Sequence, residues 1–277
     1  MSRKILGLDV RHDSVTAVLI ASSLRETQIE GCLRVPVPDT GDRAIDLRSA
    51  MEAVRSGMNT DQAYCVASIP ADEFSFRNLR VPFTGEKKID QILPFELEPT
   101  VPFPLENLVI DFQPILQAEL SGATDLIAVA AKKTTLETYL GAFAGAGLDP
   151  QVIRPGGYAT ALCLNRFASP PENWILVDIG PHRDTLFFIA SGQIRLIRSF
   201  PSFRSTNGNN GIEEKIRQTL RAFGNLSPAP MAPEKAFITG RGVNGGGEEL
   251  IRTLEAALAL PVSRADQIGR ASCRERV

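Results

Sequence analysis

The feature that most constrains the fold is a segment that occurs twice in the chain. In residues 172–200, an apolar run beginning at Trp174 ends at Asp178; a polar loop, a second apolar run, a Ser-Gly turn and an alternating third run follow. Short apolar runs bounded by turn residues predict strands. This segment is therefore expected to form three successive strands, with an acidic loop after the first.

The same design begins the chain. The apolar residues 5–8 lead into a polar loop that opens with an aspartate, and a second apolar run follows. The first aspartate loop (residues 9–16) and the second aspartate loop (residues 178–185) both begin with Asp and end with a Thr seven residues later. Either copy alone would be explained by an ordinary hairpin. Together, about half a chain apart, they predict a duplicated, two-lobed α/β fold with one acidic loop in each lobe.

Length and composition place the chain among ordinary globular proteins, with 277 residues, 43% hydrophobic, 22% charged and a net charge of −2. This length supports one large domain or two medium ones. The charge gives no reason to expect nucleic acid or an anionic membrane surface as a partner. The four cysteines show no metal-binding spacing, and no apolar run approaches the ~20 residues of a membrane span. We therefore expect a cytoplasmic protein.

The clearest proline-rich punctuation is Ser169-Pro170-Pro171. We predict a first lobe over residues 1–170, with an inserted α+β subdomain at about 74–152, and a second lobe over residues 171–265. The subdomain is expected to contain strands at residues 74–81, 108–116 and 125–131 and helices at residues 85–97 and 134–147. Pro94 should kink or end the first helix, and Thr134 or Thr135 should cap the second.

The last ten residues, Ile268 to Val277, break from the preceding pattern and have no apolar periodicity. They resemble one reading frame of a common sequencing adapter, and they are left out of the fold prediction. Cys273 would then not belong to the native protein, and no role is assigned to it. The native sequence is expected to continue past Gln267, so that the second lobe is truncated at its carboxyl end.

A glycine-rich segment (residues 240–247) follows an apolar run at 236–239 and precedes a helical pattern at 248–258. Glycine lets the backbone approach a ligand closely, and a helix start favours anions. The segment is therefore a candidate nucleotide contact, although, taken alone, an ordinary strand-to-helix turn is the favoured interpretation.

Three segments stand in the order found in the actin-like ATPase fold: LGLDVRHDSVTAV and LVDIGPHRDTLFFI, which contain the two aspartate loops, and ITGRGVNGGGEELI. The middle of the chain, KKIDQILPFELEPTVPFPLENLVIDFQPI followed by DLIAVAAKKTTLETYLGAFAGAGLDPQVI, resembles the inserted subdomain of the PilM and GspL family. The resemblance covers residues 3–265. It implies an actin-like fold and a role in the inner-membrane platform of type IV pilus assembly or type II secretion, without deciding between PilM and GspL.

The resemblance also implies a site for ATP and Mg²⁺, because carboxylates hold a hydrated magnesium ion, and hydroxyls and glycine amides meet phosphate oxygens. Asp9 and Asp178 are the implied magnesium ligands. The implied nucleotide-binding residues are Asp9, Ser14, Asp178, Gly180, Thr185, Gly240 and Gly242.

The first aspartate loop departs from the family pattern, which has a glycine soon after the aspartate and a lysine after the serine. Val10, Arg11 and His12 stand at the glycine's place, and Thr16 at the lysine's. Arg11 would still attract a phosphate. Bulky side chains where the backbone should approach the phosphates nevertheless predict weakened nucleotide binding.

The only two histidines, His12 and His182, lie one in each aspartate loop. Together with Asp9 and Asp178 they would make a metal site of two histidines and two aspartates. Polar loop residues without a special role are the favoured interpretation.

Two functions compete. The first is a scaffold that docks the cytoplasmic segment of an inner-membrane protein similar to PilN, or the assembly ATPase, and so lies at the cytoplasmic face of the inner membrane through partners or a missing carboxyl-terminal helix. The second is an active ATPase or a sugar-kinase-type phosphotransferase on the same fold. The scaffold is favoured, because no catalytic base beside a substrate pocket is evident.

The expected docking surface is the inserted subdomain, where apolar residues crowd a proline-broken segment: Phe83, Ile89, Leu93, Phe95, Val101 and Phe103. About half of them are expected to fill the subdomain's own core. An exposed apolar patch on a soluble protein indicates an interaction site. Phe83, Phe95 and Phe103 are the predicted partner-binding residues.

Overall fold

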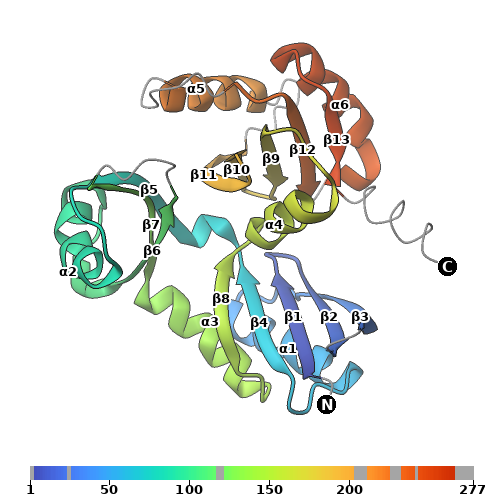
Figure 1. Ribbon diagram of the computed structural model, residues 1–277. Coiled ribbons are helices and arrows are strands. Elements are labelled where there is room, and N and C mark those ends of the chain that lie inside the picture. The colour runs from blue at the N-terminus through green and yellow to red at the C-terminus, as the bar shows by residue number, and fades with distance from the viewer. Residues whose placement is uncertain are drawn as a thin grey trace. The chain divides into compact units, whose positions relative to one another are not determined.

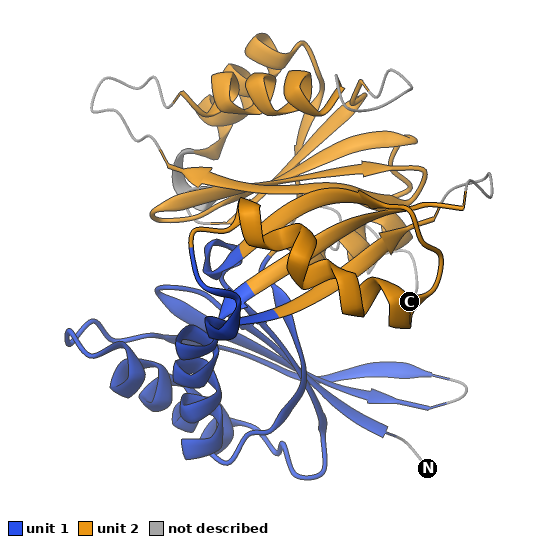
Figure 2. Cartoon of the chain, turned by 90° about the vertical axis from the view of Figure 1, so that its left-hand side faces the viewer, with its two compact units in different colours: residues 1–74, 103–109, 131–156 blue, residues 75–102, 110–130, 157–277 orange. Residues whose placement is uncertain are grey.

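The structure, a computed structural model, describes residues 3–23, 26–116, 122–202, 211–224, 232–240 and 243–265, and the side chains of residues 243–246 are outside the description. The chain forms two compact units (Figure 2). Unit 1 comprises residues 1–74, 103–109 and 131–156, and unit 2 comprises residues 75–102, 110–130 and 157–277.

Unit 1 is built on a five-stranded sheet with the strand order β3-β2-β1-β4-β8 (Figure 1). The first three strands are consecutive and antiparallel, β4 runs parallel to β1, and β8 runs parallel to β4. The elements are β1 (Arg3–Val10), β2 (Ser14–Ser22), β3 (Thr27–Pro36), α1 (Arg43–Gly57), β4 (Tyr64–Ile69), the short 3-10 helices η1 (Ala71–Glu73) and η3 (Leu105–Asn107), α3 (Lys133–Gly145) and β8 (Pro150–Pro155).

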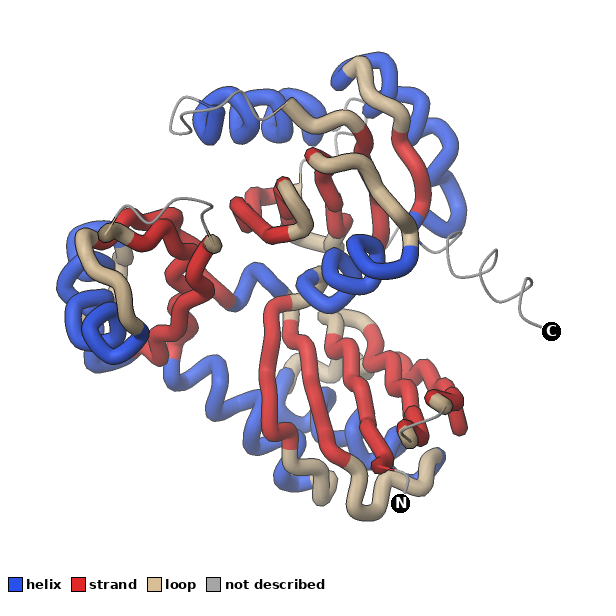
Figure 3. The backbone as a smooth tube through the Cα atoms, in the orientation of Figure 1, coloured by secondary structure: helices blue, strands red, loops and turns tan. Residues whose placement is uncertain are grey.

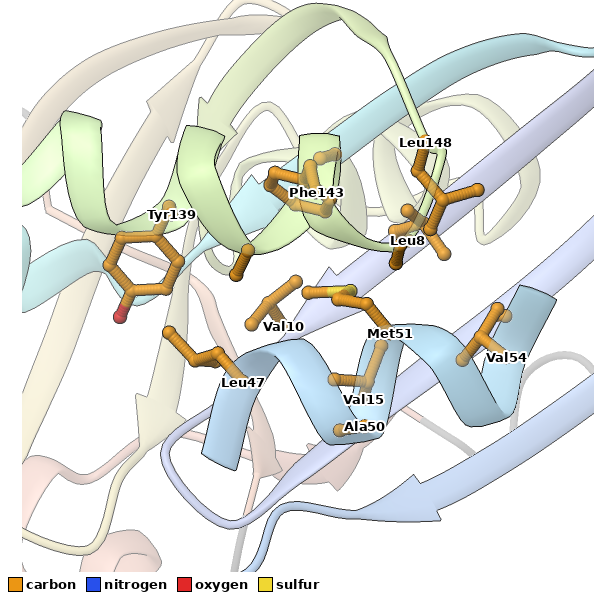
Figure 4. Close-up of a cluster of buried hydrophobic side chains, with 14 of the residues drawn as sticks. Leu8, Val10, Val15, Leu47, Ala50, Met51, Val54, Tyr139, Phe143 and Leu148 are labelled. Atoms are coloured by element: carbon orange, nitrogen blue, oxygen red, sulfur yellow. The ribbon is translucent and has the colours of Figure 1, made fainter. Parts of the chain in front are cut away.

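The hydrophobic core of unit 1 lies on one face of this sheet (Figure 4). Alternate residues of β1, namely Leu6, Leu8 and Val10, are at most 3% exposed, whereas the residues between them are only half-buried. Met51 of α1 and Phe143 of α3 pack on them, so both helices cover the same face (Figure 3). The alternating sequence of β1 follows from burial on that face.

The second five-stranded sheet, in unit 2, has the strand order β11-β10-β9-β12-β13. β9, β10 and β11 are consecutive and antiparallel, and β12 and β13 run parallel to β9. The remaining elements of the chain, most of them in unit 2, are β5 (Phe74–Val81), α2 (Glu86–Leu97), the 3-10 helix η2 (Glu98–Thr100), β6 (Leu108–Ile115), β7 (Thr124–Lys132), α4 (Tyr158–Phe167), β9 (Asn173–Ile179), β10 (Arg183–Ala190), β11 (Gln193–Pro201), α5 (Ile212–Gly224), β12 (Lys235–Gly240), α6 (Val243–Leu258) and β13 (Val262–Arg264).

The two sheets repeat each other in order and in register. Asp9 pairs with Thr16, and Asp178 pairs with Thr185. The pairing of the next two strands also shifts at the same point, after Leu19 in one sheet and after the equivalent Phe188 in the other. Two sheets with the same strand order need not have a register shift at the same position, so the shared shift is additional evidence for the repetition. The predicted repetition of strand, aspartate loop and strand is confirmed.

The second sheet is buried on both faces. Ile216 of α5 and Leu254 of α6 lie in the cluster on one face. On the other face Trp174 packs in a cluster with Leu164 of α4 and Ile127 of β7. A strand covered on both sides needs apolar residues at successive positions, which explains why β9 is buried along almost its whole length.

The predicted α+β subdomain contains a three-stranded sheet, β5-β7-β6, with α2 beside it. Ile89, Leu93 and Leu97 of α2 are buried against Leu126 and Ala128 of β7. The helix does not end at Pro94 but continues to Leu97. Because proline has no N–H, the helix loses at Pro94 the hydrogen bond that would reach the carbonyl of Asp90, and it ends within one turn of this residue.

Several local predictions have a clear outcome. The turn at Ser191-Gly192 is confirmed, with positive φ at both residues. The predicted threonine cap is wrong, because α3 follows Lys132 with no side-chain cap and the threonines lie inside the first turn. α6 begins at Val243, within the glycine-rich segment and not after it. β13 was not predicted.

The lobe boundary at residues 169–171 and the limits of the insertion stay predictions, and residues 268–277 lie outside the described residues.

Candidate functional site

The first aspartate loop lies at the end of β1 in unit 1. Oδ1 of Asp9 accepts a hydrogen bond from Ser68 Oγ at 2.8 Å, and Oδ2 accepts one from Arg11 Nε, also at 2.8 Å. The contact with Arg11 is an ion pair between side chains that are 26% and 37% exposed. Both oxygens of the first aspartate therefore have partners within unit 1.

The backbone of the same loop is held by neighbouring segments. Arg43, the first residue of α1, donates to the carbonyl oxygens of His12 at 2.7 Å and Arg11 at 3.1 Å. The amide of Arg11 donates to the carbonyl of Ser14, and the amide of Val37 donates to the carbonyl of Asp13. These bonds hold the loop in one shape, and they engage the amide of Arg11, a donor that a phosphate would otherwise be able to contact.

Ser14 is buried at the start of β2, with 4% of its surface exposed. Its hydroxyl donates to Asp13 Oδ1 at 3.3 Å and accepts from Arg34 Nη2 at 3.2 Å. Val10, which follows Asp9 in the loop, is fully buried. The hydroxyl that the sequence assigns to a phosphate is therefore engaged within unit 1.

The second aspartate loop lies in unit 2. Two glycines outside the loop, Gly157 and Gly240, bring their backbone close to the carboxylate of Asp178. Asp178 is 8% exposed. A Cβ on Gly240 would lie 2.7 Å from Asp178 Oδ1, and one on Gly157, just before α4, would lie 3.3 Å from Oδ2. Both glycines have positive φ, 100° and 83°, which favours glycine. The end of β12 and the start of α4 thus meet at this carboxylate.

A second aspartate, Asp184, holds the rest of the second loop through hydrogen bonds. The sequence did not identify it as a site residue. Asp184 is 4% exposed and accepts from the amide of Gly180 at 3.2 Å and from Ser202 Oγ at 2.6 Å. Thr185 is equally buried, and its hydroxyl shares a hydrogen bond of 2.8 Å with Ser199 of β11. Of the predicted contacts, Asp178, Gly180 and Gly240 lie close together in unit 2, and Gly242 is outside the described residues.

The histidine of the first aspartate loop has a carboxylate partner within unit 1. His12 Nε2 lies 3.1 Å from the carboxylate of Asp72 in unit 1. Across the part of the chain that the structure describes, no group of three or more His, Cys, Asp or Glu side chains is arranged to hold a metal ion. His12 therefore has a structural role in its loop.

The predicted partner-binding aromatics differ in burial. Phe95 of α2 is 71% exposed, and Phe103 is 38% exposed with Lys132 Nζ 3.9 Å from its ring centroid. Phe83 is partly buried and packs against the cluster under α2. Ile89 and Leu93 belong to that cluster. Phe95 is thus the most available of the candidates for a partner.

Residues 7–200 match the family described as type IV pilus assembly protein PilM. The chain belongs to the PilM family. Within the described residues no helix is long and apolar enough to cross a membrane.

Solved structures with the same fold agree with membership of the PilM family. A PilM–PilN type IV pilus biogenesis complex matches with a TM-score of 0.77 at 19% identity, covering 94% of this chain and 87% of that one. The cytoplasmic domain of EpsL, an inner-membrane component of the type II secretion system of Vibrio cholerae, gives 0.52 at 12% identity, covering 86% and 82%. A protein of Bacteroides thetaiotaomicron with an actin-like ATPase fold and unknown function gives 0.58 at 11%, covering 96% and 92%. The predicted actin-like α/β fold is confirmed.

The residues of this PilM family member fit magnesium and nucleotide unequally in the two units. The first loop does not fit, because Asp9 is paired with a guanidinium, Ser14 is buried and the loop backbone is bonded internally. The second loop fits better in one respect, because a glycine and not a cation stands two residues after its aspartate, although the amide of Gly180 and the hydroxyl of Thr185 are also bonded within unit 2. Gly157 was missed by sequence reasoning, although the Gly-Gly pair before a helical pattern was a readable signal.

Proposed function

We propose that this PilM family member is a scaffold of the type IV pilus assembly platform at the cytoplasmic face of the inner membrane. It docks the cytoplasmic segment of an inner-membrane protein similar to PilN and does not turn over nucleotide. The PilM–PilN complex among the solved structures of this fold supports the choice of partner. A phosphotransferase is not favoured, because both oxygens of Asp9 already have partners.

The observation that carries the scaffold proposal is the pairing of Asp9 with Arg11. Phosphoryl transfer depends on a metal ion and on preorganised donors around the phosphates. A first loop whose carboxylate, hydroxyl and backbone groups are bonded to one another supplies neither. What this chain retains is the actin-like fold itself, which serves docking without chemistry.

We place nucleotide contact in unit 2, at Asp178, Gly180 and Gly240. ATP bound there would contribute to stability and not to a catalytic cycle. Asp178→Ala is expected to abolish magnesium-dependent ATP affinity measured by calorimetry, because it removes the carboxylate proposed to hold the magnesium ion. Unchanged affinity in this variant would contradict the assignment.

For the docking surface we propose Phe95 as the main anchor, with Phe83 contributing in the same unit, and we propose Phe103, which belongs to unit 1, as a separate contact point. Interface energy concentrates in a few aromatic anchors, and Phe95 is the most exposed of the three phenylalanines. Lys132, stacked on the ring of Phe103, adds a positive charge beside that aromatic. The proposed partner segment therefore combines apolar side chains with an acidic residue.

The experiment measures binding of the immobilised PilN-like cytoplasmic segment to the full chain by biolayer interferometry. Phe95→Asp should weaken binding about tenfold or more, as expected for an aromatic anchor. Phe167→Asp is the matched control, since Phe167 is 64% exposed and Phe95 is 71% exposed. Both variants should melt near the wild type, because surface substitutions usually change stability by about 0.5 kcal/mol or less. Wild-type binding by a folded Phe95→Asp/Phe103→Asp variant would place the docking surface elsewhere.

A further inference from the structure

We propose that Arg11 is a built-in cation that takes the place of a divalent metal ion at Asp9. The inference rests on the proposed function, because it concerns why the first aspartate loop carries no nucleotide chemistry. It goes further in assigning a role to one residue: the guanidinium neutralises the carboxylate that a metal ion would otherwise engage.

The distances around the carboxylate support this role. Arg11 Nε lies 2.8 Å from Oδ2 of Asp9, and Ser68 Oγ lies 2.8 Å from Oδ1. An arginine side chain in a protein is always positively charged, and its planar group suits a carboxylate. A magnesium ion at Oδ2 would lie beside this charge, and two cations at such a distance repel each other strongly where water is partly excluded.

The backbone holds Arg11 in position to make this contact. Its amide is bonded to Ser14, and its carbonyl is bonded to Arg43. Val10, immediately before it, is fully buried. The side chain therefore leaves a fixed point two residues after Asp9, so that little backbone freedom is lost when the ion pair forms.

The duplication supplies an internal comparison. The position equivalent to Arg11, two residues after Asp178, is Gly180. A Cβ at Gly180 would collide with the carbonyl oxygen of Arg183, so only glycine fits there. In the first loop the same position accepts a long side chain that folds back onto its own aspartate. One loop has thus kept the glycine, and the other has a cation in its place.

The test measures binding of Mn²⁺ alone to the full chain by electron paramagnetic resonance. We expect Asp9→Asn to leave the Mn²⁺ affinity of the wild type within about twofold, because Asp9 is not a metal ligand there. Arg11→Gly should raise the affinity about threefold or more, and Arg11→Gly/Asp9→Asn should return it to the wild-type value. Arg11→Gln keeps the bulk of the side chain without its charge and should also raise the affinity if the glycine variant fails to fold.

Two results would overturn the proposal: a marked loss of Mn²⁺ affinity in Asp9→Asn alone, or no gain in either folded Arg11 variant. The gain must also appear as stabilisation by Mn²⁺ in thermal melts of the Arg11 variants, since a ligand that binds only the folded state raises its melting temperature. The Mn²⁺ experiment does not measure partner binding. A failure of the docking proposal can therefore be told apart from a failure of this inference.

Discussion

Asp9 and Asp178 occupy equivalent positions in two sheets of the same strand order, yet their surroundings have diverged. Two residues after Asp9 stands Arg11, which pairs with it, whereas two residues after Asp178 stands Gly180. The sheets differ in a second way, because the first has its core on one face and the second is buried on both. The two sheets therefore share their strand order and register. They differ in the residue that stands two positions after the aspartate and in whether one face or both faces of the sheet are buried.

The largest expected effect tests the difference in covering. Trp174 in β9 and Ile5 in β1 both lie four residues before the aspartate, but Trp174 is fully buried and Ile5 is partly exposed. Trp174→Ala should cost about 3–5 kcal/mol, because it leaves a large cavity in a closed core. Ile5→Ala should cost less than half as much. Urea denaturation followed by circular dichroism measures both, and equal costs would contradict the contrast between the sheets.

Alkaline pH should separate the two units. Burial, with a smaller effect from the charge of Asp149, raises the pKa of Cys65 from 9.0 to about 11. Burial, followed by the charge of Glu73, raises the pKa of Tyr139 from 10.0 to about 12. Both side chains belong to the core of unit 1. The folded state holds these protons more tightly, so the stability they contribute is present below pH 9 and is lost as the pH rises to 11 and then 12.

The expected loss at full titration is on the order of 2 kcal/mol for each group. Far-UV circular dichroism should show partial unfolding above pH 9, while the emission of Trp174, the only tryptophan, reports on unit 2 and stays native. Tyr139→Phe is the matched control and should remove the upper part of the transition. Simultaneous loss of both signals would show that the two units do not differ in alkaline stability.

Gly240→Ala tests the close approach of backbone to Asp178. The substitution puts a side chain at a φ of 100° and a Cβ against the backbone of Ile179. Strain of this kind costs about 1–3 kcal/mol. Gly141→Ala, in the exposed part of α3 with open space around it, is the control and should be neutral or slightly stabilising. An unchanged urea midpoint for Gly240→Ala would mean that the end of β12 is not held against the carboxylate.

The smallest expected effect concerns Ser68, which donates to Asp9 Oδ1. Ser68→Ala should lower the free energy of unfolding by about 1 kcal/mol, the usual net value of one hydrogen bond. Ser22→Ala, which removes a hydroxyl contact at an exposed position, should change it less. A cost for Ser68→Ala no greater than that for Ser22→Ala would show that the serine does not hold the first carboxylate.

The positions of most strands were predictable, because a strand has a recognisable sequence pattern: an apolar run bounded by turn residues. β5 has the limits expected for residues 74–81, and both aspartates lie opposite the threonines seven residues later. The start of α6 was not predictable from propensity, since glycine disfavours helix and yet the helix begins at Val243. β13, a strand of three residues, is too short to give a periodic signal.

The site was predictable as a set of positions but not as a set of contacts. The sequence identified Arg11 as a departure, whereas its ion pair with Asp9 depends on how the loop turns. Ser14 and Thr185 are buried and bonded to neighbouring strands, which a motif cannot reveal because it does not say which face a side chain takes. Asp184 reads as an ordinary polar loop residue until the fold brings Gly180 and Ser202 to it.

The most direct test of the central claim is the affinity of the full chain for the PilN-like cytoplasmic segment, measured by calorimetry with EDTA and again with Mg-ATP. A scaffold whose first loop carries its own cation should bind the segment with the same affinity in both buffers, within about twofold, because nucleotide then has little coupling to docking. A difference of about tenfold or more would contradict the account, since it would mean that bound nucleotide, including any held at Asp178, controls docking, whereas a scaffold docks its partner independently of nucleotide.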